Sequence, residues 1–365
     1  MGTVHPVDPG YMPPCARSPH RPARARARPL AAGLLALGAA LLAPGAPTAA
    51  APATSGPTLL VRGAGDGHGV GMSQEGALGY AQHGYGYTQI LAHYYTATAI
   101  GHIPTATTVR VMIGGHVKRM NIETYVRGVV GAEMPGDWPA AALEAQAVAS
   151  RTYALTDHAG GARFDVYADT RSQVYLGARA QTAATNSAVA ATAGQIVTYQ
   201  GQPAITYFFA SSGGATESVQ NGFPGAAPEP WLVGVPDPYD QGPLHSWSLS
   251  MSFASAGRRL RGLYRGRFRG IEVLRRGYSP RIVAARVLGS RGDDEVTGPE
   301  LEERLGLDST WAYFSVRTAA GVQAEPDLSH TAPPPGSGEA GGTGTGASPG
   351  PAGPSPGPAG GTGAE

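Results

Sequence analysis

One carboxyl group in this sequence has the surroundings that acid–base chemistry requires. Glu133 lies in the apolar run Val129–Pro135. Apolar surroundings disfavour the charged form of a carboxyl group, so they raise its pKa towards the range in which it exchanges a proton near neutral pH. Met134 precedes proline and is pushed out of helical geometry, so the chain must turn directly after Glu133. Glu133 is therefore the candidate general acid.

The segment after this turn predicts a helix that presents polar groups to a site. Asp137 suits the N-cap and Pro139 suits the first turn. Alanine, which costs least in a helix, dominates the residues that follow. Gln146 and Arg151 are polar positions on this helix of small, apolar side chains. We expect the helix to be buried, with its polar side towards the site.

The glycine-rich stretch Arg62–Gln74 is a second candidate. It follows the strand-like run Thr58–Val61 and precedes a helix expected to begin near Ser73, an order similar to a dinucleotide-binding fingerprint. The fingerprint fails because His68 replaces its third glycine and no acidic residue stands about twenty positions further on. The glycines let the backbone approach a ligand closely, or they serve a tight turn that His68 caps.

A pair of serines, Ser211 and Ser212, stands beside Gly213 and Gly214, which invites a search for a nucleophile. The GxSxG pattern is absent, and the sole lysine, Lys118, lies in no SxxK motif. The sequence implies no base partner for either hydroxyl. We therefore expect a solvated or substrate-lining loop.

Several of these stretches together resemble the SpoIID/LytB family, the family of stage II sporulation protein D and the amidase enhancer. The matching pieces are GVVGAEMP, WPAAALEAQAVASRTY, SQVYLG, GGATES, LGLDSTW and GHGVGMSQ. The resemblance implies a lytic transglycosylase that cleaves peptidoglycan glycan strands without a cofactor, with Glu133 as the single catalytic acid. It implies substrate binding by Arg151, Gln146, His68, Ser73, Gln74, Gln173, Tyr175, Ser211 and Ser212.

A single carboxyl group suits that chemistry. An ordinary glycosidase protonates the leaving oxygen with one carboxyl group and uses a second to activate water or to attack the sugar. In a lytic enzyme the sugar's own C6 hydroxyl attacks, so one carboxyl group can give a proton and then take one back. Arg151 would hold the sugar or orient Glu133.

A different class of function stays open. The chain could be a non-catalytic cell-wall-binding protein that enhances a separate N-acetylmuramoyl-L-alanine amidase, as the second name of the family suggests. Glu133 would then do no chemistry and could be a structural carboxylate paired with Arg151.

The order of the motifs departs from that of the family. GHGVGMSQ precedes the Glu133 stretch here, whereas in the better-known sporulation members it follows the LGL segment. Such a change is tolerable only if the two ends of the domain lie close together in space. It puts in doubt how directly His68, Ser73 and Gln74 reach the site.

Many members of the family have cysteines around the aspartate that corresponds to Asp169, and zinc is suspected there in some. Ala168 and Ser172 occupy those positions in this sequence. Without thiolates or a close histidine pair, zinc would lack ligands. We therefore predict no metal site.

The N-terminal residues predict export. Five arginines precede the apolar run Leu30–Leu42, and small residues follow at 48–51, as in a cleaved signal peptide over residues 1–50. If this segment is not cleaved, it would anchor the chain to a membrane. Cys15, the only cysteine, lies before the apolar run. Removing residues 1–50 changes 27 basic and 26 acidic residues to 22 and 25, which gives no support to a nucleic-acid binder. We expect a secreted protein of the cell wall.

The expected fold is a single α+β domain over residues 56–320, with β-hairpins packed around alanine-rich helices. The strands expected are 125–130, a hairpin over 109–113 and 117–122, a second hairpin over 195–199 and 203–210, and late strands over 282–288 and 311–316. Besides the helix after Glu133, we expect helices over 182–193 and 299–305. Residues 258–281 hold nine arginines and one acid, and we interpret them as a solvated helix face rather than a surface for an anionic wall polymer or membrane.

Residues 331–365 consist mainly of Pro, Gly, Ser, Thr and Ala, a composition that predicts a disordered tail. Deleting them should leave the thermal midpoint unchanged, because no apolar surface is removed from a core. Calorimetry of the full and shortened chains tests this prediction, and a drop of several degrees would show that the tail packs.

Overall fold

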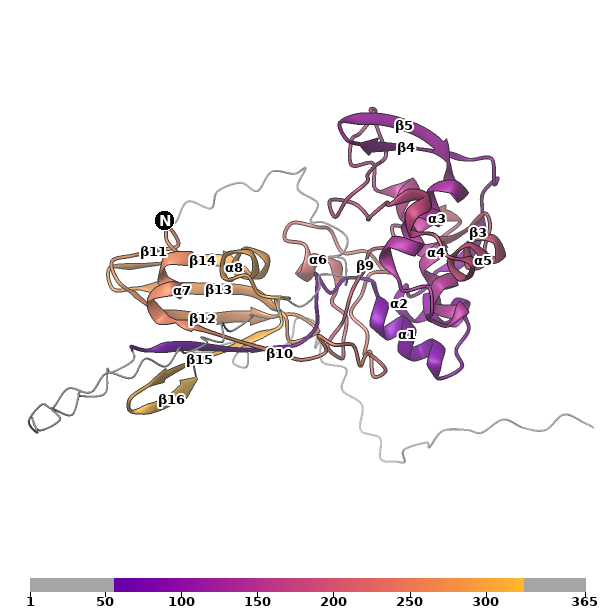
Figure 1. The fold of residues 1–365 in the computed structure, drawn as a ribbon. Coiled ribbons are helices and arrows are strands. Elements are labelled where there is room, and N and C mark those ends of the chain that lie inside the picture. The colour runs from indigo at the N-terminus through magenta and orange to yellow at the C-terminus, as the bar shows by residue number, and fades with distance from the viewer. Residues whose placement is uncertain (1–55, 325–365) are drawn as a thin grey trace, which may run out of the picture. The chain divides into compact units, whose positions relative to one another are not determined.

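The computed structural model describes residues 56–324, so the predicted signal peptide (1–50) and tail (331–365) lie outside the described residues. The described part is an α+β structure with two hydrophobic cores (Figure 1). We call residues 64–246 the helical lobe, and residues 56–63 together with 247–324 the sheet lobe. None of the helices between residues 56 and 324 has the length and apolar character needed to cross a bilayer.

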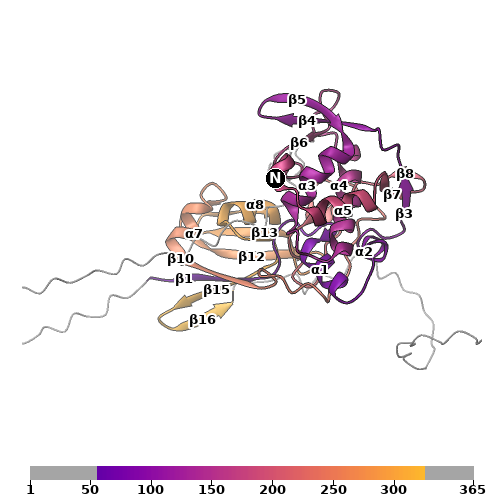
Figure 2. The ribbon, with the colours of Figure 1, turned by 45° about the vertical axis from the view of Figure 1, so that its right-hand side comes forward.

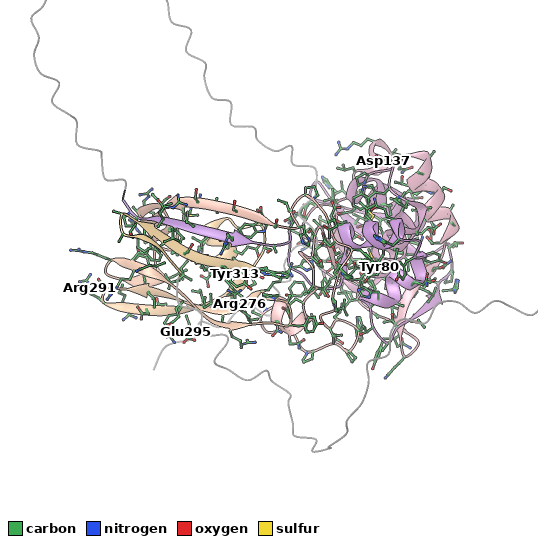
Figure 3. The ribbon with its side chains drawn as sticks, turned by 90° about the horizontal axis from the view of Figure 1, so that it is seen from below. Tyr80, Asp137, Arg276, Arg291, Glu295 and Tyr313 are labelled. Atoms are coloured by element: carbon green, nitrogen blue, oxygen red, sulfur yellow. The ribbon has the colours of Figure 1, made fainter. Side chains whose placement is uncertain are left out.

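The sheet lobe is built from two four-stranded antiparallel sheets that share one core. The first sheet has the order β10 (Trp247–Ser252), β1 (Thr58–Gly63), β15 (Ala312–Thr318), β16 (Gly321–Ala324). The second has the order β11 (Tyr264–Arg265), β14 (Gly292–Thr297), β13 (Ile282–Gly289), β12 (Phe268–Arg276). Helices α7 (Phe253–Arg259) and α8 (Gly298–Leu305) complete the core. On its outer side, Arg276 lies over the ring of Tyr313, 4.2 Å from its centroid (Figure 3).

The first and the next-to-last described strands of the chain are neighbours. Strand β1 pairs with β15 in antiparallel register from Thr58↔Arg317 to Gly63↔Ala312. The helical lobe is therefore an insertion between β1 and β10. This pairing meets the condition that the unusual order of motifs imposes, since the two ends of the domain lie side by side.

The helical lobe is organised around α4 (Ala140–Thr156), which packs against α1, α2, α3, α5 and β7. Twelve of its residues are buried, and its alanines let the neighbouring elements approach closely. The other helices are α1 (Gln74–Gln82), α2 (Tyr87–Tyr94), α3 (Ile122–Glu133), α5 (Ala183–Ala191) and the short α6 (Val219–Gly222), with a 3-10 turn, η1 (Gly177–Ala180).

Three small sheets surround these helices (Figure 2). They are β2 (Met72–Ser73) with β9 (Phe208–Phe209), β3 (Ala99–His102) with β7 (Gln195–Tyr199) and β8 (Gln202–Pro203), and β5 (His116–Asn121) with β4 (Thr108–Ile113) and β6 (Val166–Tyr167). The hairpin predicted around Gly114 and Gly115 is confirmed, and both glycines have positive φ. The helix predicted over 182–193 is also confirmed, as α5. The second predicted hairpin is shorter than expected, because the chain leaves the ladder after Pro203 and pairs again as β9 with β2.

The prediction of a strand over Tyr125–Val130 is wrong, because these residues lie inside α3. The side chain of Asn121 caps this helix by accepting hydrogen bonds from the backbone N–H groups of Glu123 (2.9 Å) and Thr124 (3.4 Å). The apolar residues also follow a helical period, which the β-branched valines concealed. Those buried are Ile122, Tyr125, Val126, Val129 and Val130.

Two further expectations need correction. Asp137 does not cap the helix after Glu133, since α4 begins at Ala140 with Pro139 as its N-cap. The arginine-rich run is mostly not helical either. It contains the end of α7 and then β11 and β12, because Gly262 and Gly266, both at positive φ, turn the chain. Alternate side chains of β12, such as Ile271 and Val273, face the core.

The glycine-rich stretch between β1 and α1 encloses a buried cation from the sheet lobe. Arg281, 1% exposed, donates hydrogen bonds from Nη1 to the carbonyl oxygens of Ser212 (3.3 Å) and Ala215 (3.1 Å). A Cβ added to Gly65 would lie 2.9 Å from Nη2 of Arg281, and one added to Gly69 would lie 2.5 Å from its Nε. These two glycines therefore make room for the guanidinium group of Arg281. Burial lowers the pKa of Arg281 to about 10, so the group stays charged at neutral pH.

The contact of Gly69 with Arg281 can be tested against a matched control. Gly69 (φ +85°) and Gly84 (φ +86°) have the same backbone conformation, but nothing lies within 4 Å of a Cβ at Gly84. Gly84→Ala should cost only the backbone strain, about 1–2 kcal/mol. Gly69→Ala should cost more, because Arg281 must also move, and its unfolding midpoint in denaturant should fall further. Equal midpoints for the two variants would contradict this account of the stretch.

Candidate active site

Glu133 is the last residue of α3, and its side chain is fully buried. One carboxylate oxygen accepts a hydrogen bond of 2.7 Å from the backbone N–H of Val174. The other accepts a longer one, 3.4 Å, from the side-chain amide of Gln74. Gln74 is the first residue of α1. The glycine-rich segment that ends at Gln74 therefore does contact the candidate acid, which the unusual order of motifs had put in doubt.

A chain of buried amides continues from this contact. Nε2 of Gln74 lies 3.5 Å from Oε1 of Gln146, whose own Nε2 donates to the hydroxyl of Ser150 at 2.9 Å. Gln173 donates to the carbonyl oxygen of Ser150 at 3.1 Å. The Oε1 atoms of Gln74 and Gln173 are buried without a hydrogen-bond partner in the described part of the chain. The predicted residues Gln74, Gln146 and Gln173 are thus brought together with Glu133.

Burial raises the pKa of Glu133 to about 7, while the hydrogen bonds from Val174 and Gln74 act in the opposite direction. The carboxyl group is therefore divided between its acid and its carboxylate form near neutral pH. A group in this condition is able both to donate and to accept a proton.

Arg151 does not contact Glu133. Its guanidinium is fully buried and pairs with Glu123 through Nε (2.9 Å) and Nη2 (2.7 Å), while Nη1 donates to the carbonyl oxygen of Gln195 at 2.9 Å. Glu123 also accepts from the backbone N–H of Gly194 at 3.0 Å. The alternative in which Arg151 pairs with Glu133 is therefore wrong, because its carboxylate partner is Glu123. It joins α3, α4 and the start of β7.

The three serines among the predicted site residues donate hydrogen bonds to a second buried carboxylate. Asp240, fully buried, accepts hydrogen bonds from the hydroxyls of Ser73 (3.2 Å), Ser211 (3.0 Å) and Ser212 (2.9 Å) and from the backbone N–H of Gly213 (3.2 Å). Ser73 is also the N-cap of α1 and accepts from the N–H of Gly76. These hydroxyls are buried and hydrogen-bonded within the fold, so the expectation of a solvated loop is wrong.

The last two predicted residues have different surroundings. His68 packs against the rings of Tyr207, Phe209 and Phe223, and its Nδ1 accepts from the N–H of Val70 at 3.0 Å. Burial lowers the pKa of His68 to about 3, so the ring is neutral and, of the two alternatives, acts as the cap of a turn. Tyr175 follows Val174 directly and stacks on Tyr125 with 5.2 Å between ring centroids.

The positions expected to lack zinc ligands hold a hydrogen-bonded turn. The hydroxyl of Ser172 donates to Asp157 at 2.5 Å and accepts from the backbone N–H of Tyr167 at 3.1 Å. Asp157 is buried, and burial raises its pKa. Within residues 56–324, no three histidine, cysteine, aspartate or glutamate side chains lie close enough together to hold a metal ion.

Sequence reasoning missed three groups of this region. The backbone N–H of Val174 carries no side-chain signal, although its neighbours Gln173 and Tyr175 were singled out. Asp237 accepts from the hydroxyl of Tyr94 at 2.8 Å, and burial, with the charge of Asp240, raises the pKa of Asp237 to about 7. The only available signal for Asp237 and Asp240 was the pair of acids in PDPYD after the serine loop.

Comparisons with known proteins agree with the resemblance. A model of the stage II sporulation protein family (SpoIID) matches residues 114–199. An uncharacterized protein of Brachyspira hyodysenteriae is 38% identical over 187 residues, which cover 50% of this chain and 48% of that protein. Stage II sporulation protein D of Bacillus subtilis is 32% identical over 34% of this chain and 41% of its own length. The amidase enhancer of the same organism is 35% identical over 35% of this chain and 17% of its own length.

These matches show which proteins the chain is similar to. Residues 114–199 are similar to the SpoIID family, and the matched stretch includes Glu133, Gln146, Arg151, Gln173 and Tyr175. The matched segments span less than half of the three relatives described above. Residues 64–113, which contain Gln74, lie outside the matched family model.

The raised pKa of Glu133 predicts a pH-dependent stability. A carboxyl pKa raised on folding stabilises the protein fully below the unfolded value, and this contribution is lost as the pH rises through the folded value. Between pH 4.5 and 7, the wild type should therefore lose up to about 3 kcal/mol relative to Glu133→Gln, which cannot ionise. Denaturant unfolding of both proteins at pH 5 and pH 8 measures this difference. A constant difference would mean that the carboxyl group titrates normally.

Proposed function

We propose that this protein is a secreted lytic transglycosylase that cleaves peptidoglycan glycan strands and leaves 1,6-anhydro ends. The observation that carries the proposal is the state of Glu133. This carboxyl group is fully buried, and its pKa of about 7 is set by burial and by two hydrogen bonds, without a neighbouring charge. It accepts hydrogen bonds from one backbone N–H and one amide, and a second carboxylate is not among the partners given by the described residues.

The chemistry requires one group to act twice. Protonated Glu133 donates its proton to the glycosidic oxygen as the bond from that oxygen to C1 breaks. The C6 hydroxyl of the same sugar then attacks C1, and the Glu133 carboxylate takes the hydroxyl proton. The two steps regenerate the acid and consume no water. A pKa near neutrality serves both steps, because the group must be protonated in the first and ionised in the second.

Gln74 is suited to serve both states of Glu133. Its amide donates to the carboxylate at 3.4 Å, and its oxygen is buried without a partner in the described structure. Rotating the amide by about 180° would turn that oxygen towards a protonated carboxyl group, which needs an acceptor. Gln74 is also the neighbour most easily displaced, since its hydrogen bonds of 3.4 and 3.5 Å are longer than the 2.7 Å bond from Val174. Because Glu133 is fully buried, the sugar must take the place of such a neighbour.

Two observations favour the alternative of a non-catalytic amidase enhancer. A carboxyl group without exposed surface is also what a purely structural glutamate would show, and a relative is named amidase enhancer. In that case the chain binds the cell wall and stimulates an N-acetylmuramoyl-L-alanine amidase, and Glu133 contributes only to the packing of α1, α3 and α4.

Glu133→Gln separates the two classes. It keeps the shape of the side chain but removes the exchangeable proton, so release of anhydro-sugar from purified glycan strands should fall at least about a hundredfold. Glu144→Gln, the same change on the partly exposed surface of α4, should leave the rate unchanged. Mass spectrometry of the products measures both rates.

Normal release by folded Glu133→Gln would end the assignment of this residue as the acid. Absence of release by the wild type, together with a faster amidase reaction when the chain is added, would establish the amidase-enhancer function instead.

A further inference from the structure

The two lobes carry opposite net charges. The helical lobe, residues 64–246, contains 8 arginines and lysines against 13 aspartates and glutamates. Residues 247–324 of the sheet lobe contain 13 arginines against 8 acidic residues. Such an asymmetry within one chain points to an anionic partner for the basic part. The proposed acid–base site does not account for it, because Glu133 and its partners lie in the helical lobe.

Four of these arginines gather where two connections of the second sheet meet. We call Arg265, Arg267, Arg269 and Arg291 the arginine tip. The turn after β11 is hydrogen-bonded to the turn between β13 and β14, through the N–H of Arg291 to the carbonyl oxygen of Arg265 (3.0 Å) and through Ser290 to Arg267 (2.9 Å). The side chain of Arg291 reaches the backbone of Gly266, since a Cβ there would lie 3.1 Å from its Cγ. Figure 3 shows Arg291 pointing outward from the end of the sheet lobe.

The arginine tip is free to meet a partner. All four side chains are exposed, and none of them forms an ion pair in the part of the chain that the structure describes. Two other arginines of this lobe, Arg286 and Arg304, do pair with acids. The nearest acid along the chain, Asp293, accepts a hydrogen bond from the N–H of Gly289 at 2.8 Å.

We propose that the arginine tip binds a linear polymer with phosphodiester groups. Residues two apart along an extended chain lie up to about 7 Å from each other, so one small anion cannot satisfy the whole row. A polymer with repeated charges can place one group at each guanidinium. The fork of N–H donors in arginine matches the two free oxygens of a phosphodiester, which stays ionised at every pH at which the protein folds.

The composition of the tip argues against a membrane surface. Segments that bind a bilayer carry exposed tryptophan, phenylalanine or leucine next to their cations. None of the large hydrophobic side chains exposed in residues 56–323 belongs to residues 258–293 except Tyr278, which lies beyond the far end of β12. Phe268, which stands between Arg267 and Arg269 in the sequence, packs against Phe253 and Tyr264.

The experiment measures binding of the protein to poly(glycerol phosphate), a linear polymer of phosphodiester groups, by fluorescence anisotropy. In the tip variant, Arg265, Arg267 and Arg291 are each changed to Glu. In the control variant, Arg119, Arg163 and Arg179, exposed arginines of the helical lobe, are changed to Glu, so both variants have the same net charge. We expect the tip variant to bind at least tenfold more weakly than the control. If three phosphates are neutralised, wild-type affinity should also fall roughly twentyfold between about 50 and 200 mM salt, and the tip variant should lose most of that dependence.

Equal weakening in the two variants, or none in the tip variant, would overturn the proposal. So would equally tight binding of polyglutamate, which has carboxylates in place of phosphates, or tighter binding to vesicles of anionic phospholipid. A thermal melt shows whether each variant is folded, and these exposed positions should tolerate the change. Release of anhydro-sugar by the tip variant should equal that of the wild type, so this proposal can fail without affecting the assignment of Glu133.

Discussion

The desolvation of a single carboxyl group is the constraint on which the rest of the helical lobe depends. Glu133 can hold a near-neutral pKa only if water is excluded on every side, and exclusion requires elements that pack closely. The small side chains of α4 permit this, because they let α1, α3 and α5 pack closely against α4. The cost of burying the carboxyl group is reduced by one good hydrogen bond from Val174 and one long contact with Gln74. A third strong donor would lower the pKa and remove the property that acid–base chemistry needs.

Around this group, the other buried charges stabilise the framework. Arg151 with Glu123 fixes α3 to α4, Asp240 gathers the serines at the start of α1, and Arg281 is enclosed between the two lobes. Each is a charge that would be costly to bury alone, and each is matched by donors or acceptors from segments that are distant in sequence. Asp240 fixes the start of α1, and therefore the position of Gln74, through the hydroxyl of Ser73.

Much of the local structure was predictable from the sequence, and the contacts between distant segments were not. The glycine pair at 114–115, the start of a helix near Ser73 and the helix over 182–193 follow from short-range chemistry, so they were predicted correctly. The valines of α3 have a high strand propensity, and only the cap at Asn121 and burial on one helical face reveal the helix. Glu133 was identified from its apolar neighbours and the family resemblance. The partner of Arg151 was mistaken because both Glu123 and Glu133 lie within reach in sequence, and only the packing of α3 on α4 decides between them.

Because β1 and β15 are neighbours, the order of the segments along the chain could change without changing their arrangement in space. Antiparallel partners lie about 5 Å apart, so a short loop would join the end of β15 to the start of β1. The chain could then be opened at another exposed turn, such as Gly114-Gly115, and still bring Gln74 to Glu133. The same adjacency allows the glycine-rich stretch to stand before or after the other segments along the chain without a change of its place in the fold. A circular permutation of the gene changes which residue is made first while leaving the interior of the protein untouched.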